Sequence, residues 1–102
     1  MVDRIFKHEL PSGNYMEGVT LELTKHARTL HVGLAGGKVC LWEQHNVDDE
    51  NDEGSYPRTF IVVGTGVGFQ PSENCRLLYI GTVVQPTSVE DFVWHVYEQA
   101  PY

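Results

Sequence analysis

Short segments in which apolar and polar residues alternate recur along the whole chain, and this pattern restricts the folds open to it. Residues 19–24 read Val-Thr-Leu-Glu-Leu-Thr, and the same alternation returns in residues 29–34. Successive side chains of a β-strand point to opposite faces, so each segment would bury one face and leave the other in water. The only helical pattern is a single turn at residues 88–91. The chain is therefore expected to be all-β.

Turn signals divide the β-type segments and set their number. Gly36-Gly37 separates two of them, and two glycines favour a type I′ hairpin because both central residues of that turn need positive φ. Strands are expected at residues 4–10, 19–24, 29–34, 38–44, 58–64, 77–85 and 92–98. Segments of this length and spacing predict about seven mostly antiparallel strands in a small sandwich or partly closed barrel.

The alternation also predicts which side chains fill the core. Residues 58–64 are apolar on both faces at their centre, as expected of a central strand. In the last strand Trp94 and Val96 share one side, and His95 lies on the other. The residues expected to be largely buried are Leu30, Val32, Leu34, Leu41, Ile61, Val63, Ile80, Trp94 and Val96.

Length and charge favour one domain that does not bind bulk nucleic acid. The chain has 102 residues, which suits a single domain over residues 1–102, and its net charge is −7. Six of its fourteen acidic residues lie in residues 43–53, so the remainder carries eight acids against seven Lys and Arg. Residues 47–54 are therefore expected to form an acidic surface loop. The near-neutral body lacks the basic surface that polyanions require, although it leaves room for a small anion.

No motif indicates catalysis, a metal or a cofactor. The five histidines have no ligand spacing, and the two cysteines form no Cys-x-x-Cys pair. An EF-hand register starting at Asp49 places Phe60 where a bidentate Glu is required. No serine lies in a nucleophile-elbow motif. No run approaches the ~18 apolar residues of a membrane span. We expect a cytoplasmic protein with free thiols that is not an enzyme.

A glycine-rich loop and two arginines are the first candidates for a binding site. Gly64, Thr65 and Gly66 follow a buried segment, and glycine allows backbone N–H groups to approach an anion closely. Arg58 precedes that segment and Arg76 follows the loop, so either guanidinium could reach a phosphate. The same glycines also suit an irregular turn, and the same arginines suit ordinary surface charges.

Two tryptophans and a histidine complete the predicted site. Trp42 and Trp94 offer large apolar areas to the core, and either would stack on a base if it faced a cleft. His95 is an alternative polar contact. The predicted ligand-binding residues are thus Arg58, Gly64, Thr65, Gly66, Arg76, Trp42, Trp94 and His95.

The order of several short motifs resembles that of a family of small phage and prophage proteins known only as a domain of unknown function. These motifs are Leu30-His31-Val32-Gly33, Cys40-Leu41-Trp42, Arg58-Thr59-Phe60, Gly64-Thr65-Gly66, Tyr79-Ile80-Gly81-Thr82 and Phe92-Val93-Trp94-His95-Val96. The resemblance covers nearly the whole chain. It implies a phage-encoded protein in the host cytoplasm, similar to the sponges that sequester cyclic nucleotide signals of antiviral defence.

The function implied by this resemblance is immune evasion by binding a small cyclic nucleotide, without catalysis, in a homo-oligomer. Two alternatives stay open at this point. One is an interaction module that inhibits a host protein through the acidic loop, and the other is a minor phage structural or assembly protein.

Overall fold

Seven antiparallel β-strands make up most of the computed structural model, which describes residues 2–11, 18–24, 26–47, 55–70 and 75–101. Two sheets are formed, with strand orders β1-β4-β3 and β2-β5-β7-β6. No helix in the described part of the chain is long and apolar enough to cross a membrane. The strands are β1 (Asp3–Glu9), β2 (Val19–Thr24), β3 (Arg28–Ala35), β4 (Lys38–Asn46), β5 (Ser55–Gly64), β6 (Cys75–Pro86) and β7 (Asp91–Pro101).

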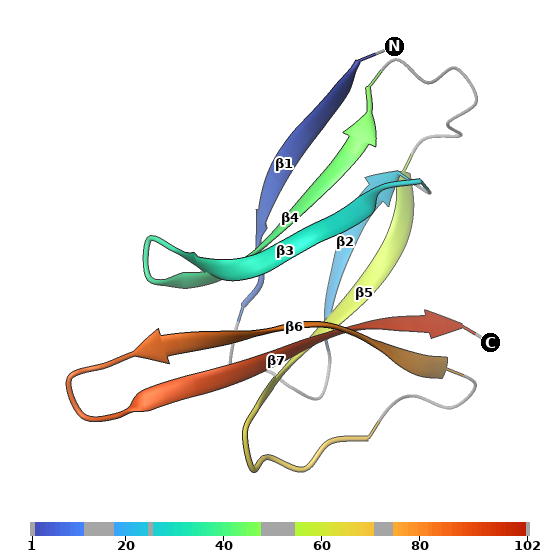
Figure 1. The fold of residues 1–102 in the computed structure, drawn as a ribbon. Coiled ribbons are helices and arrows are strands. Elements are labelled where there is room, and N and C mark those ends of the chain that lie inside the picture. The colour runs from blue at the N-terminus through green and yellow to red at the C-terminus, as the bar shows by residue number, and fades with distance from the viewer. Residues whose placement is uncertain (1, 12–17, 25, 48–54, 71–74, 102) are drawn as a thin grey trace.

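The two sheets pack as a sandwich and are not closed into a barrel (Figure 1). Every observed pairing is antiparallel, which confirms the expected all-β class. The bounds predicted for β2 agree with the structure, and β6 and β7 are longer at both ends than the alternation indicated. The acidic loop predicted at residues 47–54 lies outside the described residues except for Val47.

The sheets meet where β3 lies against β6. A Cβ atom on Gly81 of β6 would lie 2.6 Å from Cγ2 of Val32 in β3, so only glycine permits this approach. The register of β6 against β7 also shifts between Tyr79 and Gly81. The β6 bulge and the missing side chain together bring the larger sheet against the smaller one.

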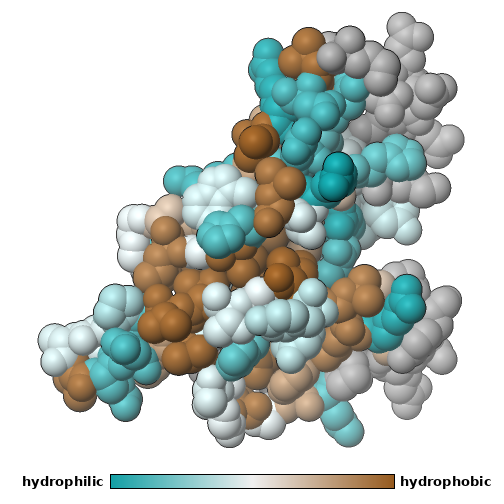
Figure 2. Space-filling view, viewed as in Figure 1, coloured by the Kyte–Doolittle hydropathy of each residue, from teal (hydrophilic) through white to brown (hydrophobic). Residues whose placement is uncertain are grey.

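A continuous apolar core fills the space between the sheets. Leu41, Phe60 and Val96 are fully buried, and Figure 2 shows apolar residues gathered across the middle of the molecule. The core cluster consists of Leu10, Leu23, Ala27, Val32, Val39, Leu41, Phe60, Val62, Val83, Trp94 and Val96. Ile61 and Val63 are also buried, on the opposite side of β5 from Phe60 and Val62, so β5 is covered on both faces as predicted.

The β3–β4 hairpin has the turn predicted from its two glycines. Ala35 pairs with Lys38, which leaves Gly36 and Gly37 as the two-residue loop. Their φ angles are 59° and 76°, the positive values that a type I′ turn requires. This short turn fixes the register of β3 against β4 and so places Val32 over Gly81.

One core residue was predicted wrongly, and two are only half-buried. Leu30 is 44% exposed because the register of β3 against β4 shifts between Thr29 and His31, which places it in a bulge. Leu34 and Ile80 are partly buried and pack at the border of the core. The alternation of apolar and polar residues does not predict a bulge, because residues on both sides of the bulge keep the same period.

Leu41 and Leu30 provide a matched test of this arrangement. Leu41→Ala should lower the free energy of unfolding by ~2–5 kcal/mol because it opens a cavity in the fully buried core. Leu30→Ala should cost less than ~1 kcal/mol because the bulged side chain is already exposed. Urea unfolding of both variants measures the difference. Equal losses would contradict the observed bulge.

Candidate ligand-binding site

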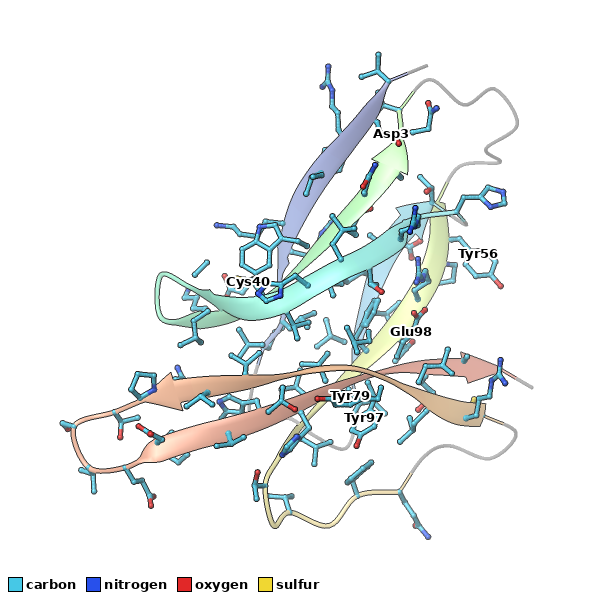
Figure 3. All side chains as sticks on the ribbon, viewed as in Figure 1. Asp3, Cys40, Tyr56, Tyr79, Tyr97 and Glu98 are labelled. Carbon is cyan, nitrogen blue, oxygen red and sulfur yellow. The ribbon has the colours of Figure 1, made fainter. Side chains whose placement is uncertain are left out.

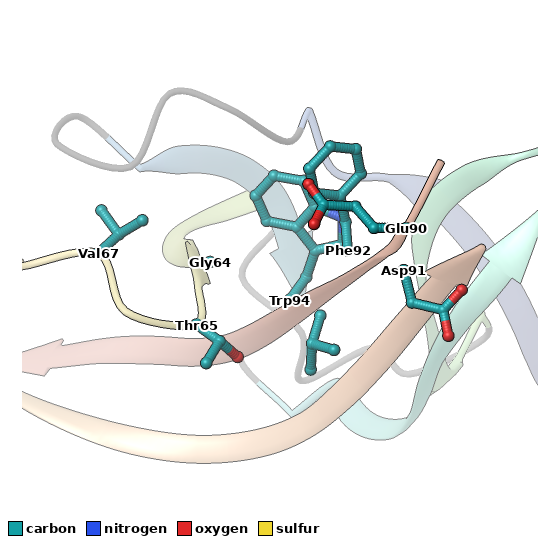
Figure 4. A pocket seen from close by; sticks show the side chains of 8 residues that line it. Gly64, Thr65, Val67, Glu90, Asp91, Phe92 and Trp94 are labelled. Atoms are coloured by element: carbon teal, nitrogen blue, oxygen red, sulfur yellow. The ribbon is translucent and has the colours of Figure 1, made fainter. Parts of the chain in front are cut away.

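A cavity lies where β5 ends and its neighbour β7 continues. The β5–β7 ladder ends with Gly64 opposite Trp94, whereas β7 extends back to Asp91. Beyond Gly64 the chain turns away, with the Val67 N–H donating to the Gly64 carbonyl (3.1 Å). The cavity measures about 420 Å³ (Figure 4). It is lined by Gly64, Thr65, Val67, Glu90, Asp91, Phe92, Val93 and Trp94.

Two aromatic rings form one wall of the cavity. Phe92 and Trp94 project to the same side of β7, with ring centroids 6.0 Å apart and planes tilted by 35°. Trp94 is almost buried, and its indole Nε1–H donates to Oε1 of Gln85 (2.8 Å), which fixes the ring orientation. A Cβ atom on Gly64 would touch both the indole and Val67, so the glycine keeps this space open.

Two carboxylates border the cavity at the β6–β7 hairpin. Glu90 ends a tight loop in which its N–H donates to Oγ1 of Thr87 (3.1 Å) and its carbonyl accepts from the Thr87 N–H (3.1 Å). In Figure 4 the Glu90 side chain is turned toward the aromatic rings, and the carboxylate of Asp91 points away from them. Neither Lys nor Arg lines the cavity in the described part of the chain.

A row of hydrogen bonds holds the cavity loop from the reverse side of the sheet. Thr65 Oγ1 lies 2.7 Å from Nε2 of His95, and Nδ1 of the same ring lies 3.1 Å from Oγ1 of Thr82. The hydroxyl of Tyr79 continues the row to Thr82 (2.5 Å). Figure 3 shows Tyr79 beside Tyr97, and their ring centroids are 5.6 Å apart. This row and the backbone bond from Thr65 N–H to the Val93 carbonyl (3.1 Å) fix one wall of the cavity.

Three of the eight residues predicted from the sequence lie together in this cavity. They are Gly64, Thr65 and Trp94, contributed by the end of β5, the loop after it and β7. Gly66 forms the adjacent turn, with a φ of 84°, and does not line the cavity. His95 lies on the opposite side of β7 from Trp94 and contacts the site through Thr65.

The other three predicted residues lie elsewhere. Trp42 packs beside His31 on the smaller sheet, with ring centroids 5.7 Å apart. Arg76 is exposed at the far end of the β6–β7 ladder, roughly 30 Å from the hairpin loop at ~3.3 Å per residue. Arg58 lies near the start of β5, whereas the cavity lies at its end. The structure therefore places no predicted cation beside the Gly64–Gly66 loop.

Arg58 on β5 forms an ion pair with Glu98 on β7 and also bonds to the turn between β2 and β3. Its Nε and Nη2 donate to the two carboxylate oxygens of Glu98, each at 2.7 Å, and its Nη1 donates to the Ala27 carbonyl at 2.6 Å. The hydrogen bonds to Glu98 raise the pKa of Arg58, burial opposes this, and the charges of Glu98 and Glu43 add to the increase. A raised pKa in the folded state stabilises the fold below the pKa of the unfolded chain, so this contribution is fully present at neutral pH.

A second polar cluster, not anticipated from the sequence, lies inside the sandwich. Glu43 is fully buried on β4. Its carboxylate contacts Nε2 of His8 at 3.2 Å and Nδ1 of His45 at 2.9 Å. These bonds satisfy a carboxylate that burial would otherwise destabilise. No group of three or more His, Cys, Asp or Glu side chains is placed to hold a metal ion in the ranges that the structure describes.

Five residues of the cavity escaped the sequence prediction: Val67, Glu90, Asp91, Phe92 and Val93. One signal for Phe92 was present, because it shares a strand face with Trp94. The sequence held no such signal for Glu90 and Asp91, because their place beside the Gly64 loop depends on the pairing of β7 with β5.

The family described as Domain of unknown function (DUF7352) matches residues 1–102, and the chain belongs to it. Neither the curated proteins nor the solved structures contain a match to it.

The two arginines allow the structural role of Arg58 to be measured. Arg58→Ala should lower the free energy of unfolding by roughly 2–4 kcal/mol, because it leaves the largely buried Glu98 carboxylate without its partner. Arg76→Ala should change stability by less than ~0.5 kcal/mol, because Arg76 is exposed. Thermal or urea unfolding compares the two variants. A negligible effect at Arg58 would contradict the ion pair.

Proposed function

We propose that this DUF7352 protein takes up one base of a small cyclic nucleotide in the cavity beside Trp94 and sequesters the nucleotide without chemical change. The observation that carries the proposal is a pocket in which two aromatic rings, a carboxylate and an open loop meet. A volume of about 420 Å³ lies in the range of ~300–1,000 Å³ typical of small-molecule sites. It suits one base with part of its sugar.

The aromatic wall supplies the main attraction for a base. A base stacked on an aromatic side chain contributes ~1–3 kcal/mol, and every base offers a π-face. The Trp94 ring is held by its bond to Gln85, so it loses little freedom when a ligand binds. Phe92 is 46% exposed and would gain burial under the same ligand.

The charges of the cavity favour the base over the phosphate. Its lining contains Glu90 and Asp91 and no Lys or Arg among the described residues. A phosphate inside it would meet two like charges, whereas a neutral base would not. In this proposal the phosphates stay outside, in solvent, and the Arg58–Glu98 pair keeps its structural role. This differs from the phosphate site that the sequence indicated around Arg58 and Arg76.

The biological setting of the proposal comes from the resemblance to phage proteins noted above. A phage-encoded protein in the host cytoplasm would remove a defence signal by mass action. The cavity beside Trp94 suits one base, and a cyclic dinucleotide has two bases. Two copies of the chain around one ligand would therefore bury both bases, as the two-fold symmetry of such a ligand allows. The expected stoichiometry is one cyclic dinucleotide for two chains.

The two tryptophans provide a direct test of the cavity. In the Trp42→Phe variant Trp94 is the sole indole, and a base that stacks on the exposed Phe92 ring beside it should quench its fluorescence when a cyclic nucleotide is titrated. A panel of cyclic di- and trinucleotides and cyclic ADP-ribose isomers is titrated. A ligand at about 100 times its Kd should add ~2.7 kcal/mol and raise the melting temperature by about 10 °C or more.

Trp94→Phe is the matched variant, in which Trp42 reports from the other sheet. Its fluorescence should stay constant as ligand is added. Bound nucleotide should be recovered intact after the protein is denatured. The proposal is wrong if no member of the panel stabilises the protein, or if quenching is seen through Trp42 and not through Trp94.

The salt dependence of binding separates the two possible positions of the phosphates. If the base occupies the cavity near Glu90 and Asp91, added salt screens the repulsion between these carboxylates and the phosphates. The affinity, measured by calorimetry between about 50 and about 300 mM NaCl, should then stay constant or increase with salt. A steep loss of affinity with salt would instead indicate phosphate contacts with arginine.

A further inference from the structure

We infer that the cavity selects guanine among the bases, through the Glu90 carboxylate. This inference rests on the proposed function and adds the identity of the base to it. It is carried by the position of Glu90, whose carboxylate borders the same cavity as the Trp94 and Phe92 rings.

The edges of the bases differ in what they can offer a carboxylate. An ionised carboxylate only accepts hydrogen bonds, through two oxygens side by side. Guanine presents two adjacent donors, N1–H and the N2 amino group, so it can bond both oxygens at once. Adenine and cytosine place a ring-nitrogen acceptor next to their amino group, and uracil flanks its single N–H with two carbonyls. Guanine alone avoids placing an acceptor against the carboxylate.

The local structure holds Glu90 in a position to make this contact. Its backbone is fixed on both sides, because its N–H and its carbonyl both bond to Thr87. Its carboxylate has no hydrogen-bond or ion-pair partner among the described residues, so it is available to a ligand. A charge-assisted, bidentate contact of this kind discriminates between bases by ~1–3 kcal/mol, or roughly 5- to 150-fold in affinity.

Asp91 is the natural control for Glu90. Both acids border the cavity and contribute the same charge, but the Asp91 side chain points away from the rings in Figure 4. A general electrostatic effect on the ligand would therefore respond equally to either residue. A specific contact with the base edge would respond only to Glu90.

The experiment measures the affinities of cyclic di-GMP, cyclic di-IMP and cyclic di-AMP for the wild-type protein and for Glu90→Gln and Asp91→Asn. Hypoxanthine keeps N1–H but lacks the N2 amino group, so cyclic di-IMP removes one of the two donors. We expect the wild-type protein to bind cyclic di-GMP at least 10-fold more tightly than either analogue. Glu90→Gln should reduce this preference to less than 3-fold, and Asp91→Asn should leave it unchanged. Both substituted side chains are exposed, and a melting curve of each variant confirms that it is folded.

The outcomes separate this inference from the function on which it rests. Equal binding of all three ligands, quenched through Trp94, would overturn the selection of guanine and leave the proposed function standing. Absence of binding by every cyclic nucleotide would overturn both. A preference for cyclic di-GMP that Glu90→Gln keeps, or that Asp91→Asn lowers to the same extent, would overturn the role of Glu90 and leave the proposed function standing.

Discussion

The contact between β3 and β6 over Gly81 holds the two sheets of this protein together. β3 is an edge strand of the smaller sheet and β6 is an edge strand of the larger one, so one edge of each sheet contacts the other. Because the methyl groups of Val32 occupy the space that a side chain at position 81 would need, the approach depends on a single missing carbon atom. The apolar core then fills the sandwich from this contact inward, through Leu41, Phe60 and Val96. Two polar clusters add to this core. Glu43 is paired with two histidines, and Arg58 is paired with Glu98.

The cavity follows from a difference in strand length. β7 pairs with β6 from Asp91 onward, but with β5 only from Trp94 onward. The first residues of β7 therefore have no strand partner on the β5 side, where only the Thr65 N–H bonds to Val93 and the chain then turns away. The core side of β7 alternates Phe92, Trp94 and Val96, so the same row of side chains passes from an open site into the buried core. Trp94 therefore packs against the core and also lines the cavity.

The sequence predicted those features that depend on neighbouring residues. Alternation identified the strands, and the two glycines at 36 and 37 identified the hairpin with its positive φ angles. The choice between a sandwich and a partly closed barrel needed the structure, because it depends on which edges pair. The burial predicted for Leu30 was wrong for a similar reason, since its bulge arises from the register of β3 against β4. The candidate site was predicted in part: Gly64, Thr65 and Trp94 meet, but Glu90 and Phe92 join them only through the antiparallel pairing of β7.

The two arginines show that residues on either side of a loop in the sequence need not lie beside it in the fold. In the sequence, Arg58 and Arg76 stand on either side of the Gly64 loop and resemble a pair of phosphate ligands. In the fold, both arginines lie away from that loop. Glu98 accepts from Nε and Nη2 of Arg58, and the Ala27 carbonyl accepts from Nη1. What remains at the loop is an aromatic wall with acidic neighbours. In the proposed function a nucleotide is recognised there by the stacking and the hydrogen-bond donors of its base, because the local charge repels its phosphates.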